Sequence, residues 1–512
     1  MNRPGVAAYM KLVNLIAMPP GGPAPSPRRP GPRGPAGFRL YWAIALITLL
    51  ALTAGCARVT YPEKDLAERL EYDAAARARY RLDPDWWLVY GDPKLNRLMD
   101  LALKNNIDLA QAAISVNRAL YQANLISGNL APSFSGGFDG SAGKNIKESG
   151  PSSRSAGGNL NLSYELDLWG RVRDSVSAQQ WEYLATIEDR ETARLTLINS
   201  VTDAYFNLAY LNDAIAAAEL NIKNYKAIEG AVSAKFQAGK LAAVEPAQAR
   251  QSILSAENNL IDYQTQRKTA EQTLRNLLNL KPGDPLDLDG LTLTKIKLPP
   301  LDLSIPLSVL ANRPDLKAAE FRLQSSFKSV EASEKAWLPS ITLGAALSSA
   351  GQAINTAMNN PVAGGSISIN LPFLDWNTVL WNLRISEADF EKVRLNFEKA
   401  LTTALNEVDT YYYTYDRARK TLENTRRKYA YDQRISDYYR DRYQAGAGEL
   451  SDWLSALSTL NSSRLSALND LYRTLQYENM TYKAMAGYYR TLPATVGASP
   501  DGGSAAPGGG VR

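Results

Sequence analysis

Two short stretches of the chain, Lys235–Lys240 (KFQAGK) and Arg442–Ala447 (RYQAGA), share the tripeptide Gln-Ala-Gly, with their glycines 207 residues apart. Other pairs recur at the same offset. They are Asp108-Leu109 with Asp315-Leu316, Pro132-Ser133 with Pro339-Ser340, and Asn199, Val201 and Tyr205 with Asn406, Val408 and Tyr412. A constant offset through most of the chain indicates a tandem duplication, whose period is far longer than that of a solenoid repeat. Each copy is therefore expected to be a supersecondary assembly of its own.

The two copies are predicted to cover residues 95–280 and 306–490, each with a helix, two strands and a long helical hairpin. Apolar residues at three- and four-residue spacing predict the helices. The main ones are Leu95–Gly128, Arg171–Gln237 and Pro246–Leu280 in the first copy, and Asn377–Ala445 and Leu450–Tyr489 in the second. The helix 171–237 would span roughly 100 Å at 1.5 Å per residue. A helix of that length is expected to pack against its neighbours as coiled coil.

Four segments break the helical rhythm, two in each copy. In GGNLNLSYELDLWG (Gly157–Gly170) leucines and a tyrosine alternate with polar residues, and in AGGSISINLPFLDW (Ala363–Trp376) Ile367, Ile369, Leu371 and Phe373 share one face. The other two are APSFSGGFDGSAG (Ala131–Gly143) and LPSITLGAALSSAG (Leu338–Gly351). About ten alternating residues with an aromatic residue near the end (Trp169, Trp337, Trp376) are typical of membrane-barrel strands. The edge of a soluble sandwich shows the same alternation.

The membrane interpretation of these strands requires more than one chain. An open sheet cannot lie in lipid, because its unpaired edge groups would find no partner. Eight-stranded barrels are filled with side chains. Four strands per chain therefore predict an oligomer, and three chains with twelve strands are the smallest assembly expected to leave a lumen.

The N-terminal segment 1–55 has the layout of a bacterial export signal. It holds six basic and no acidic residues, and an apolar run ends just before Cys56, the only cysteine of the chain. The run is short for a membrane-spanning helix, although a retained short anchor remains an alternative. Cys56 follows Ala54-Gly55, an arrangement similar to a lipobox, so acylation of its thiol with a diacylglycerol and an N-acyl chain is expected. Ala57, which is not an aspartate, points to the outer membrane.

The composition excludes several classes of site. Without the signal segment the chain carries 51 basic and 52 acidic residues, which removes the support for nucleic-acid binding. The sequence contains no histidine. Zinc centres, Cys/His pairs and Ser-His-Asp triads are therefore excluded, and we expect neither an enzyme, a metal site nor a cofactor other than the acyl chains.

The ensemble of motifs resembles the TolC-like outer membrane efflux proteins, in their lipoprotein (NodT-type) branch. The stretches that carry the resemblance are WWLVYGDPKLNRLMDLALKNNIDLAQA from Trp86, SYELDLWGRVR from Ser163, RPDLKAAE from Arg313, NLPFLDW from Asn370 and both QAG turns. They cover essentially the whole mature chain in the expected order.

The resemblance implies a homotrimer in the outer membrane of a Gram-negative bacterium, with a twelve-stranded β-barrel on a long periplasmic α-helical barrel. The trimer would act as the passive exit duct of a tripartite efflux pump. Its partners would be a periplasmic adaptor and an inner-membrane pump, expected to be of the RND type, and its cargo drugs or other small solutes. Two alternatives remain: the duct of a type I protein secretion system, and a periplasmic coiled-coil scaffold lipoprotein without a pore.

The resemblance also assigns roles near the two turns. Gly239, Lys240, Gly446 and Gly448 would meet the adaptor at the periplasmic tip. Asp452, six residues past the second turn glycine, would line a constriction, where Ser455 replaces a second acid. Tyr443 and Glu245 would form a phenol–carboxylate hydrogen bond that latches the tip closed.

Three segments lie outside the two copies. They are 56–94, a lipid-anchored stretch expected at the equator of the duct, the Pro-rich equatorial linker 281–305, and the Gly/Pro/Ser-rich tail 491–512, which is expected to be disordered.

Overall fold

The computed structural model of the chain describes residues 80–144, 146, 152–298, 310, 312–352, 356, 359 and 361–491. All of them belong to one compact unit, Glu68–Arg512. The predicted signal segment, Cys56 and nearly all of the C-terminal tail lie outside the described residues, as do 56–79 and part of the linker.

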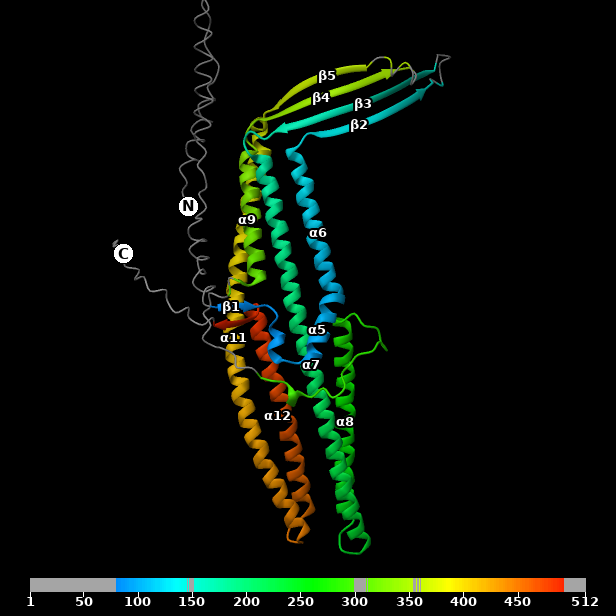
Figure 1. The fold of residues 1–512 in the computed structure, drawn as a ribbon, viewed down its shortest axis with the longest axis vertical. Helices are drawn as coiled ribbons and strands as arrows, with labels where there is room; N and C mark the ends of the chain where they lie inside the picture. The colour runs from blue at the N-terminus through cyan, green and yellow to red at the C-terminus, as the bar shows by residue number, and fades with distance from the viewer. Residues whose placement is uncertain are drawn as a thin grey trace, which may run out of the picture. The chain divides into compact units, whose positions relative to one another are not determined.

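The described elements repeat in the same order, and the predicted mixed α and β class is confirmed (Figure 1). Copy one contains α5 (Pro93–Asn105), α6 (Ile107–Ser127), β2 (Ser133–Gly143), β3 (Ser153–Leu166), α7 (Arg171–Gln237) and α8 (Val244–Leu277). Copy two contains α9 (Pro314–Lys335), β4 (Ser340–Gly351), β5 (Pro361–Asn370), α11 (Trp376–Gln444) and α12 (Leu450–Ala484). Short 3-10 turns are η1 (Trp86–Tyr90), η2 (Gly128–Leu130), η3 (Leu293–Lys295) and η5 (Pro372–Asp375).

The first helix of copy one was predicted as a single segment, Leu95–Gly128, and this is wrong. Asn106 is extended (ψ 128°) and separates α5 from α6. Its side-chain oxygen accepts a hydrogen bond from the backbone N–H of Leu109 at 2.9 Å, and its amide donates to the carbonyl of Leu277 at 2.9 Å. An asparagine that caps the next helix offers the backbone an alternative to continuing the previous one.

The last helix ends at Ala484, not at Tyr489 as predicted. Ala486 has a left-handed backbone (φ 61°), and the N–H of Gly487 donates to the carbonyl of Tyr482 at 2.8 Å, which closes a Schellman cap. Asn279 (φ 54°) ends α8 in the same way, again at the 207-residue offset.

The residues after this cap form β6 (Tyr488–Thr491), which pairs antiparallel with β1 (Tyr80–Asp83). The two ends of the described chain are thereby joined. This small sheet was not predicted, because four-residue strands carry too little alternation to be recognised.

The long helices lie in a row whose order follows from their contacts. Towards the sheet the order is α6–α7–α9–α11, and towards the hairpin turns it is α8–α7–α12–α11. α7 changes partners along its length, which explains why its buried residues follow no single face. The free edges of this row are α6 and α8 on one side and α11 on the other.

The four long strands form one antiparallel sheet in the order β2-β3-β4-β5. The register places apolar side chains on one face: Phe134, Phe138, Leu160, Leu162, Tyr164, Ile341, Leu343, Leu347, Ile367 and Ile369. Several are widely exposed, for example Ile367 at 72% and Phe134 at 71%. The opposite face carries mainly Ser, Asn and small residues. A sheet with an exposed apolar face and a polar reverse side is suited to stand between lipid and water.

The predicted strand 363–376 is too long. β5 ends at Asn370, and Pro372 starts the 3-10 turn η5, so Leu371 and Phe373 do not continue the face of Ile367. Proline lacks the N–H that a ladder requires. Trp169, Trp337 and Trp376 accordingly lie outside the strands, near the junction with the helices.

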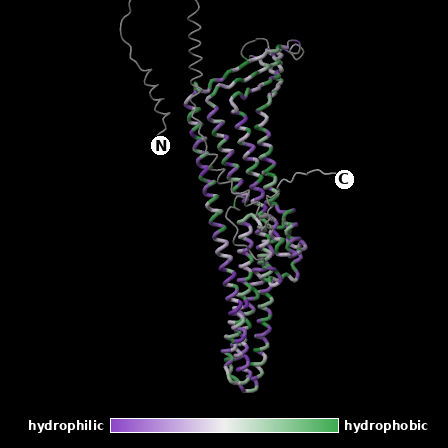
Figure 2. The backbone as a smooth tube through the Cα atoms, turned by 60° about the vertical axis from the view of Figure 1, so that its left-hand side comes forward, coloured by the Kyte–Doolittle hydropathy of each residue, from purple (hydrophilic) through white to green (hydrophobic). Residues whose placement is uncertain are grey.

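Polar and apolar residues alternate along the long helices (Figure 2). In the part of the chain that the structure describes, no helix combines the length and the apolar character needed to cross a bilayer.

The helical core contains a buried carboxyl, Glu478 on α12. One oxygen accepts a hydrogen bond from the hydroxyl of Tyr482 at 3.2 Å, and the other has no partner among the described residues. Burial raises the pKa of Glu478 well above its usual range, against the smaller effect of Tyr482. Burial and the nearby Glu478 also raise the pKa of Tyr90, whose hydroxyl has no hydrogen-bond partner within the described ranges.

The buried carboxyl predicts a loss of stability with rising pH. Because the folded pKa lies above the unfolded one, the stabilisation is complete below about pH 4.3 and is lost as pH rises towards the folded value. Glu478→Gln should therefore flatten the fall of the thermal midpoint above about pH 4.3, measured by circular dichroism in detergent. Glu257→Gln, a partly exposed carboxyl, is the control. Parallel pH curves for wild type and Glu478→Gln would contradict the prediction.

Candidate functional site

The two Gln-Ala-Gly turns have the same backbone geometry. Gly239 (φ 69°) and Gly446 (φ 72°) are both left-handed. The N–H of Lys240 donates to the carbonyl of Lys235 at 3.0 Å, and the N–H of Ala447 donates to that of Arg442 at 2.9 Å. Each turn is therefore a Schellman cap that ends a helix of more than 65 residues. α7 and α11 each begin beside the sheet, so the turns at their other ends are the parts of each hairpin that lie furthest from the sheet (Figure 1).

The two turns differ in their side chains. Lys240 is exposed after the first glycine, whereas the second turn continues to Gly448. A Cβ at Gly448 would lie 3.2 Å from the Cβ of Arg442, so this position favours glycine for close approach. The guanidinium of Arg442 donates to the carbonyl of Ala447 at 2.5 Å, which closes the second turn more tightly.

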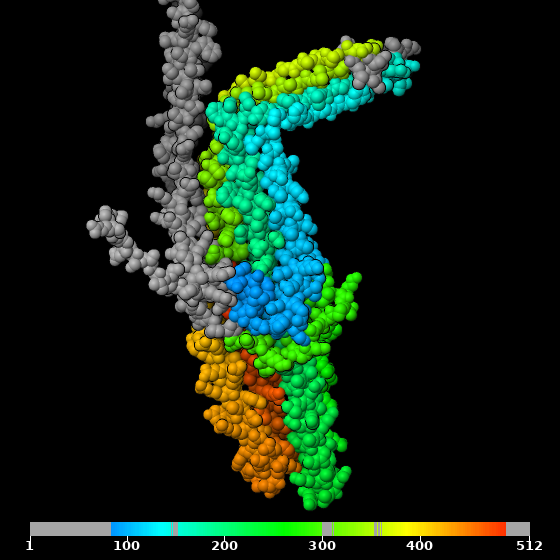
Figure 3. Space-filling model, in the orientation of Figure 1, coloured from blue at the N-terminus to red at the C-terminus, as the bar shows by residue number. Residues whose placement is uncertain are grey.

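A hydrophobic cluster of its own joins the two hairpins near their turns, where they lie side by side (Figure 3). It consists of Ile222, Tyr225, Ile228, Val232, Ala256, Tyr443, Leu450, Leu454 and Leu457. Their spacing in the sequence could have predicted the cluster, but not which helices share it. The turns are therefore carried by packed helices rather than by loops.

Tyr443 lies at the centre of this junction, but the predicted hydrogen bond to Glu245 is not formed. The phenolic oxygen is buried and has no hydrogen-bond partner among the described residues. Burial and, to a lesser extent, the charge of Glu245 raise the pKa of Tyr443. The ring instead packs against Trp453, with centroids 5.5 Å apart, and the Lys235 ammonium lies 4.4 Å from its centroid. The structure thus brings Tyr443 and Glu245 into electrostatic range through packing.

Asp452 lies in the first turn of α12 and is exposed. It lines a shallow hollow with Asp432, Tyr439 and Ser455, among others. A carboxylate at a helix N-terminus is favoured by the helix dipole. The position leaves its charge accessible to solvent, as lining a passage requires.

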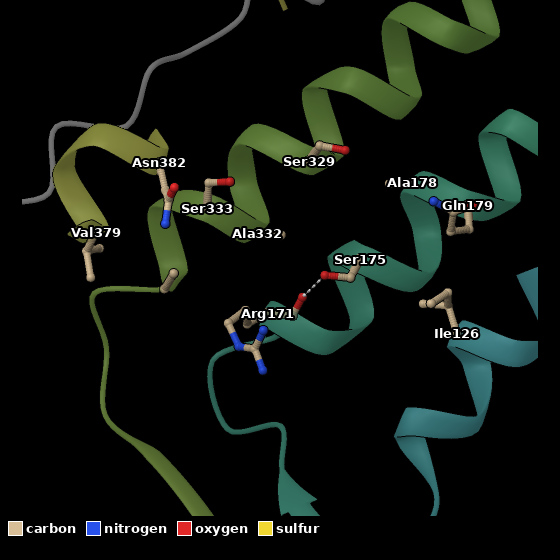
Figure 4. A pocket seen from close by; sticks show the side chains of 11 residues that line it. Ile126, Arg171, Ser175, Ala178, Gln179, Ser329, Ala332, Ser333, Val379 and Asn382 are labelled. Carbon is tan, nitrogen blue, oxygen red and sulfur yellow. Dashed lines mark hydrogen bonds between the residues drawn. The ribbon is translucent and has the colours of Figure 1, made fainter. Parts of the chain in front are cut away.

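Another hollow lies at the other end of the helices, where they meet the strands (Figure 4). Its volume is about 440 Å³, and α6, α7, α9 and α11 line it, mostly with Ser, Ala, Asn and Gln. Its single charged residue, Arg171, is engaged by Glu165, with nitrogen–oxygen distances of 2.7 and 2.9 Å. The lining therefore presents no pair of groups for acid–base or nucleophilic chemistry. Within the described ranges, no three acidic or cysteine side chains gather as a metal site would require.

Comparison with known proteins places both copies in one family. The family model "Outer membrane efflux protein" matches residues 98–280 and again 305–487, and both ends of the two matches are 207 residues apart. The "Toxin and drug export protein A" of Aggregatibacter actinomycetemcomitans is 47% identical over 446 residues, which cover 87% of this chain and 97% of the relative.

More distant relatives match most of the chain. The "Probable outer membrane lipoprotein SilC" of Salmonella typhimurium is 25% identical over 413 residues, 79% of this chain and 88% of the relative. The open state of the MtrE outer membrane channel of Neisseria gonorrhoeae superimposes with a TM-score of 0.69 at 27% identity. It covers 77% of this chain and 89% of that one.

The turn glycines should be sensitive to any side chain. Gly239→Ala and Gly446→Ala are each expected to lower the free energy of unfolding by about 1 kcal/mol, because a left-handed backbone disfavours L residues. Gly230→Ala, in an exposed helical position with open space around it, should instead stabilise by about 0.5–1 kcal/mol. Thermal unfolding in detergent measures all three. Equal shifts at Gly230 and at the turns would refute the assigned backbone geometry.

The role of Tyr443 predicts a difference between its ring and its hydroxyl. Tyr443→Phe should leave the thermal midpoint unchanged or slightly raised, because the buried hydroxyl has no bond to lose. Tyr443→Ala should cost about 3 kcal/mol through loss of packing. If Tyr443→Phe destabilises as much as Tyr443→Ala, the hydroxyl has a partner after all.

Proposed function

Because the chain belongs to the outer membrane efflux protein family, it is an exit duct in the outer membrane of a Gram-negative bacterium, and we propose that three copies assemble to form that duct. The observation that carries the proposal is the four-stranded sheet, which has one apolar face, one polar face and two free edges. In lipid each edge must find a partner. Pairing β5 of one chain with β2 of the next chain gives both edges a hydrogen-bonding partner.

The helical row supports the same arrangement with two unlike apolar edges. On α6 and α8 the exposed large apolar residues are Ile107, Ile114, Tyr121, Leu125, Val244, Leu254 and Ile261. On α11 they are Trp376, Trp381, Ile385, Leu395, Tyr413, Tyr431, Ile435 and Tyr438. Spacing of seven residues from Ile107 to Ile114 to Tyr121 is that of a coiled-coil seam.

Unlike edges join head to tail, and such contacts form a ring when the rotation between neighbouring chains closes. A two-fold dimer would instead require each edge to match itself. Three chains provide twelve strands, and a barrel of that size leaves a lumen. Two chains provide eight strands, and side chains would fill the interior of such a barrel. The polar face of the sheet then lines the passage, and the apolar face contacts lipid.

The two hairpin turns of each chain would meet the periplasmic adaptor, so that a trimer presents six turns. Gly239, Lys240 and Gly446 are exposed, and Gly448 is partly exposed, as an adaptor contact requires. The adaptor would connect the duct to an inner-membrane pump of the RND type. The difference between the lysine-bearing and the glycine-rich turn would give the adaptor two kinds of contact.

The resting duct would be closed at the turns. Asp452 would line the constriction, and Tyr443 would hold the second hairpin against the first through its ring, with Glu245 contributing charge rather than a hydrogen bond. Opening would then require the cluster around Tyr443 to separate or shift. This replaces the hydrogen-bonded latch that the sequence suggested.

Acylation of Cys56 would anchor the N-terminus in the outer membrane. The lipobox-like sequence supports it, and so does the relative SilC, which is named a lipoprotein. The chain itself would carry out no catalysis and need no cofactor beyond the acyl groups.

The cargo would be drugs or other small solutes delivered by the pump. Relatives of this chain carry names that mention toxin and drug export or pyoverdine export, which fits a duct that leaves selection to its partners. The name of the 47% identical relative includes toxin export, so a protein cargo of the type I kind is the alternative.

The assembly predicts that the edges, rather than other exposed apolar sites, determine the trimer. Ile114→Asp should abolish trimers in size-exclusion chromatography with light scattering, and should abolish conductance in planar bilayers, because it buries a carboxylate in an apolar seam. Leu220→Asp, an exposed position on the central helix α7, should preserve both. A trimeric, conducting Ile114→Asp protein would refute the proposed edge. A wild-type trimer that stays non-conducting even when Tyr443→Ala loosens the cluster at the turns would favour the pore-free scaffold.

A further inference from the structure

The polar face of the sheet is almost free of charge. In the described strands β2–β5 only three residues are charged: Asp139, Arg154 and Glu165. Arg154 lies opposite Ala142, which is on the same face of β2 as Phe134 and Phe138. Arg154 therefore belongs to the apolar face. Glu165 lies on the polar face, but Arg171 binds both of its oxygens. Asp139 is thus the one charge on the polar face without a counterion among the described residues.

The surroundings of Asp139 leave its carboxylate open. The register places Gly157 opposite it and Ala350 next along the same row, so no larger side chain covers it. A Cβ at Gly157 would lie 3.5 Å from each carboxylate oxygen of Asp139, so the carboxylate lies over the space that the glycine leaves. It forms no hydrogen bond or ion pair with another described residue, and it is exposed.

We infer that Asp139 determines the ionic selectivity of the barrel section of the duct. This rests on the proposed trimer, in which three Asp139 carboxylates form a ring on an otherwise neutral wall of Ser, Asn, Gly and Ala. A fixed ring of like charge attracts cations and repels anions within about one Debye length, roughly 8 Å at 0.15 M salt and 30 Å at 0.01 M. Cationic solutes would therefore be enriched in the barrel and anionic ones depleted.

The inference is tested with the full chain reconstituted in planar bilayers under a KCl gradient near 0.01 M. Asp139→Asn should lower the K⁺/Cl⁻ permeability ratio about two-fold, and Asp139→Lys should reverse the preference. Both effects should vanish near 1 M salt, where the Debye length is about 3 Å. Arg154→Gln, which removes a charge from the opposite face of the same sheet, is the matched control and should leave the ratio unchanged.

A second variant guards against misfolding. Asp139→Cys should lose selectivity, and reaction with an aqueous sulfonate-bearing thiol reagent should restore it by returning a negative charge to the lumen. Phe138→Cys, on the apolar face, should not respond. Conducting Asp139→Asn channels with the wild-type ratio would overturn the role of Asp139 and leave the duct intact. A wild-type protein that does not assemble into trimers would overturn the proposed duct itself.

Discussion

The unpaired edges of a four-stranded sheet are the constraint on which the rest of this molecule depends. A sheet with a widely exposed apolar face is unstable in water, and one with free N–H and C=O groups along its edges is unstable in lipid. A single chain can therefore bury the sheet stably in neither water nor lipid. In the proposed assembly the helices bring β2 of one chain to β5 of the next, because α6 leads into β2 at one edge of the sheet and α11 comes after β5 at the other edge.

Duplication provides the two unlike edges within one chain. Both copies retain the hairpin turn and even the left-handed cap, at Asn279 and Ala486, yet their surfaces have diverged. α6 and α8 of copy one present aliphatic residues and one tyrosine, whereas α11 of copy two presents tryptophans and several tyrosines as well as aliphatic residues, and three of its tyrosine rings lie beside arginines. In a ring built from such chains, copy one and copy two alternate around the axis, so that the tip carries two kinds of turn.

Regular features were predictable from the sequence, and interactions between distant segments were not. The bounds of α7 follow from 67 residues without proline, and the strand alternation indicates which face is apolar. At the break, Asn106 caps α6 and also donates to the carbonyl of Leu277, which is 171 residues away, and helical periodicity reveals neither interaction. The same holds for Tyr443. The family pattern suggested a hydrogen bond to Glu245, but the ring packs against Trp453 and Lys235, and its buried hydroxyl has no hydrogen-bond partner in the described part of the chain.

Crosslinking between the two edges tests the head-to-tail ring most directly. Tyr121→Cys on α6 and Trp381→Cys on α11 lie at similar distances along their helices from the sheet, and Cys56 is the only native cysteine. With a short bifunctional thiol reagent, the double variant should give a ladder that ends at three chains, whereas each single variant should remain uncrosslinked. Dimers from either single variant would indicate a two-fold interface, and a ladder that continues past three chains would contradict the closed trimer.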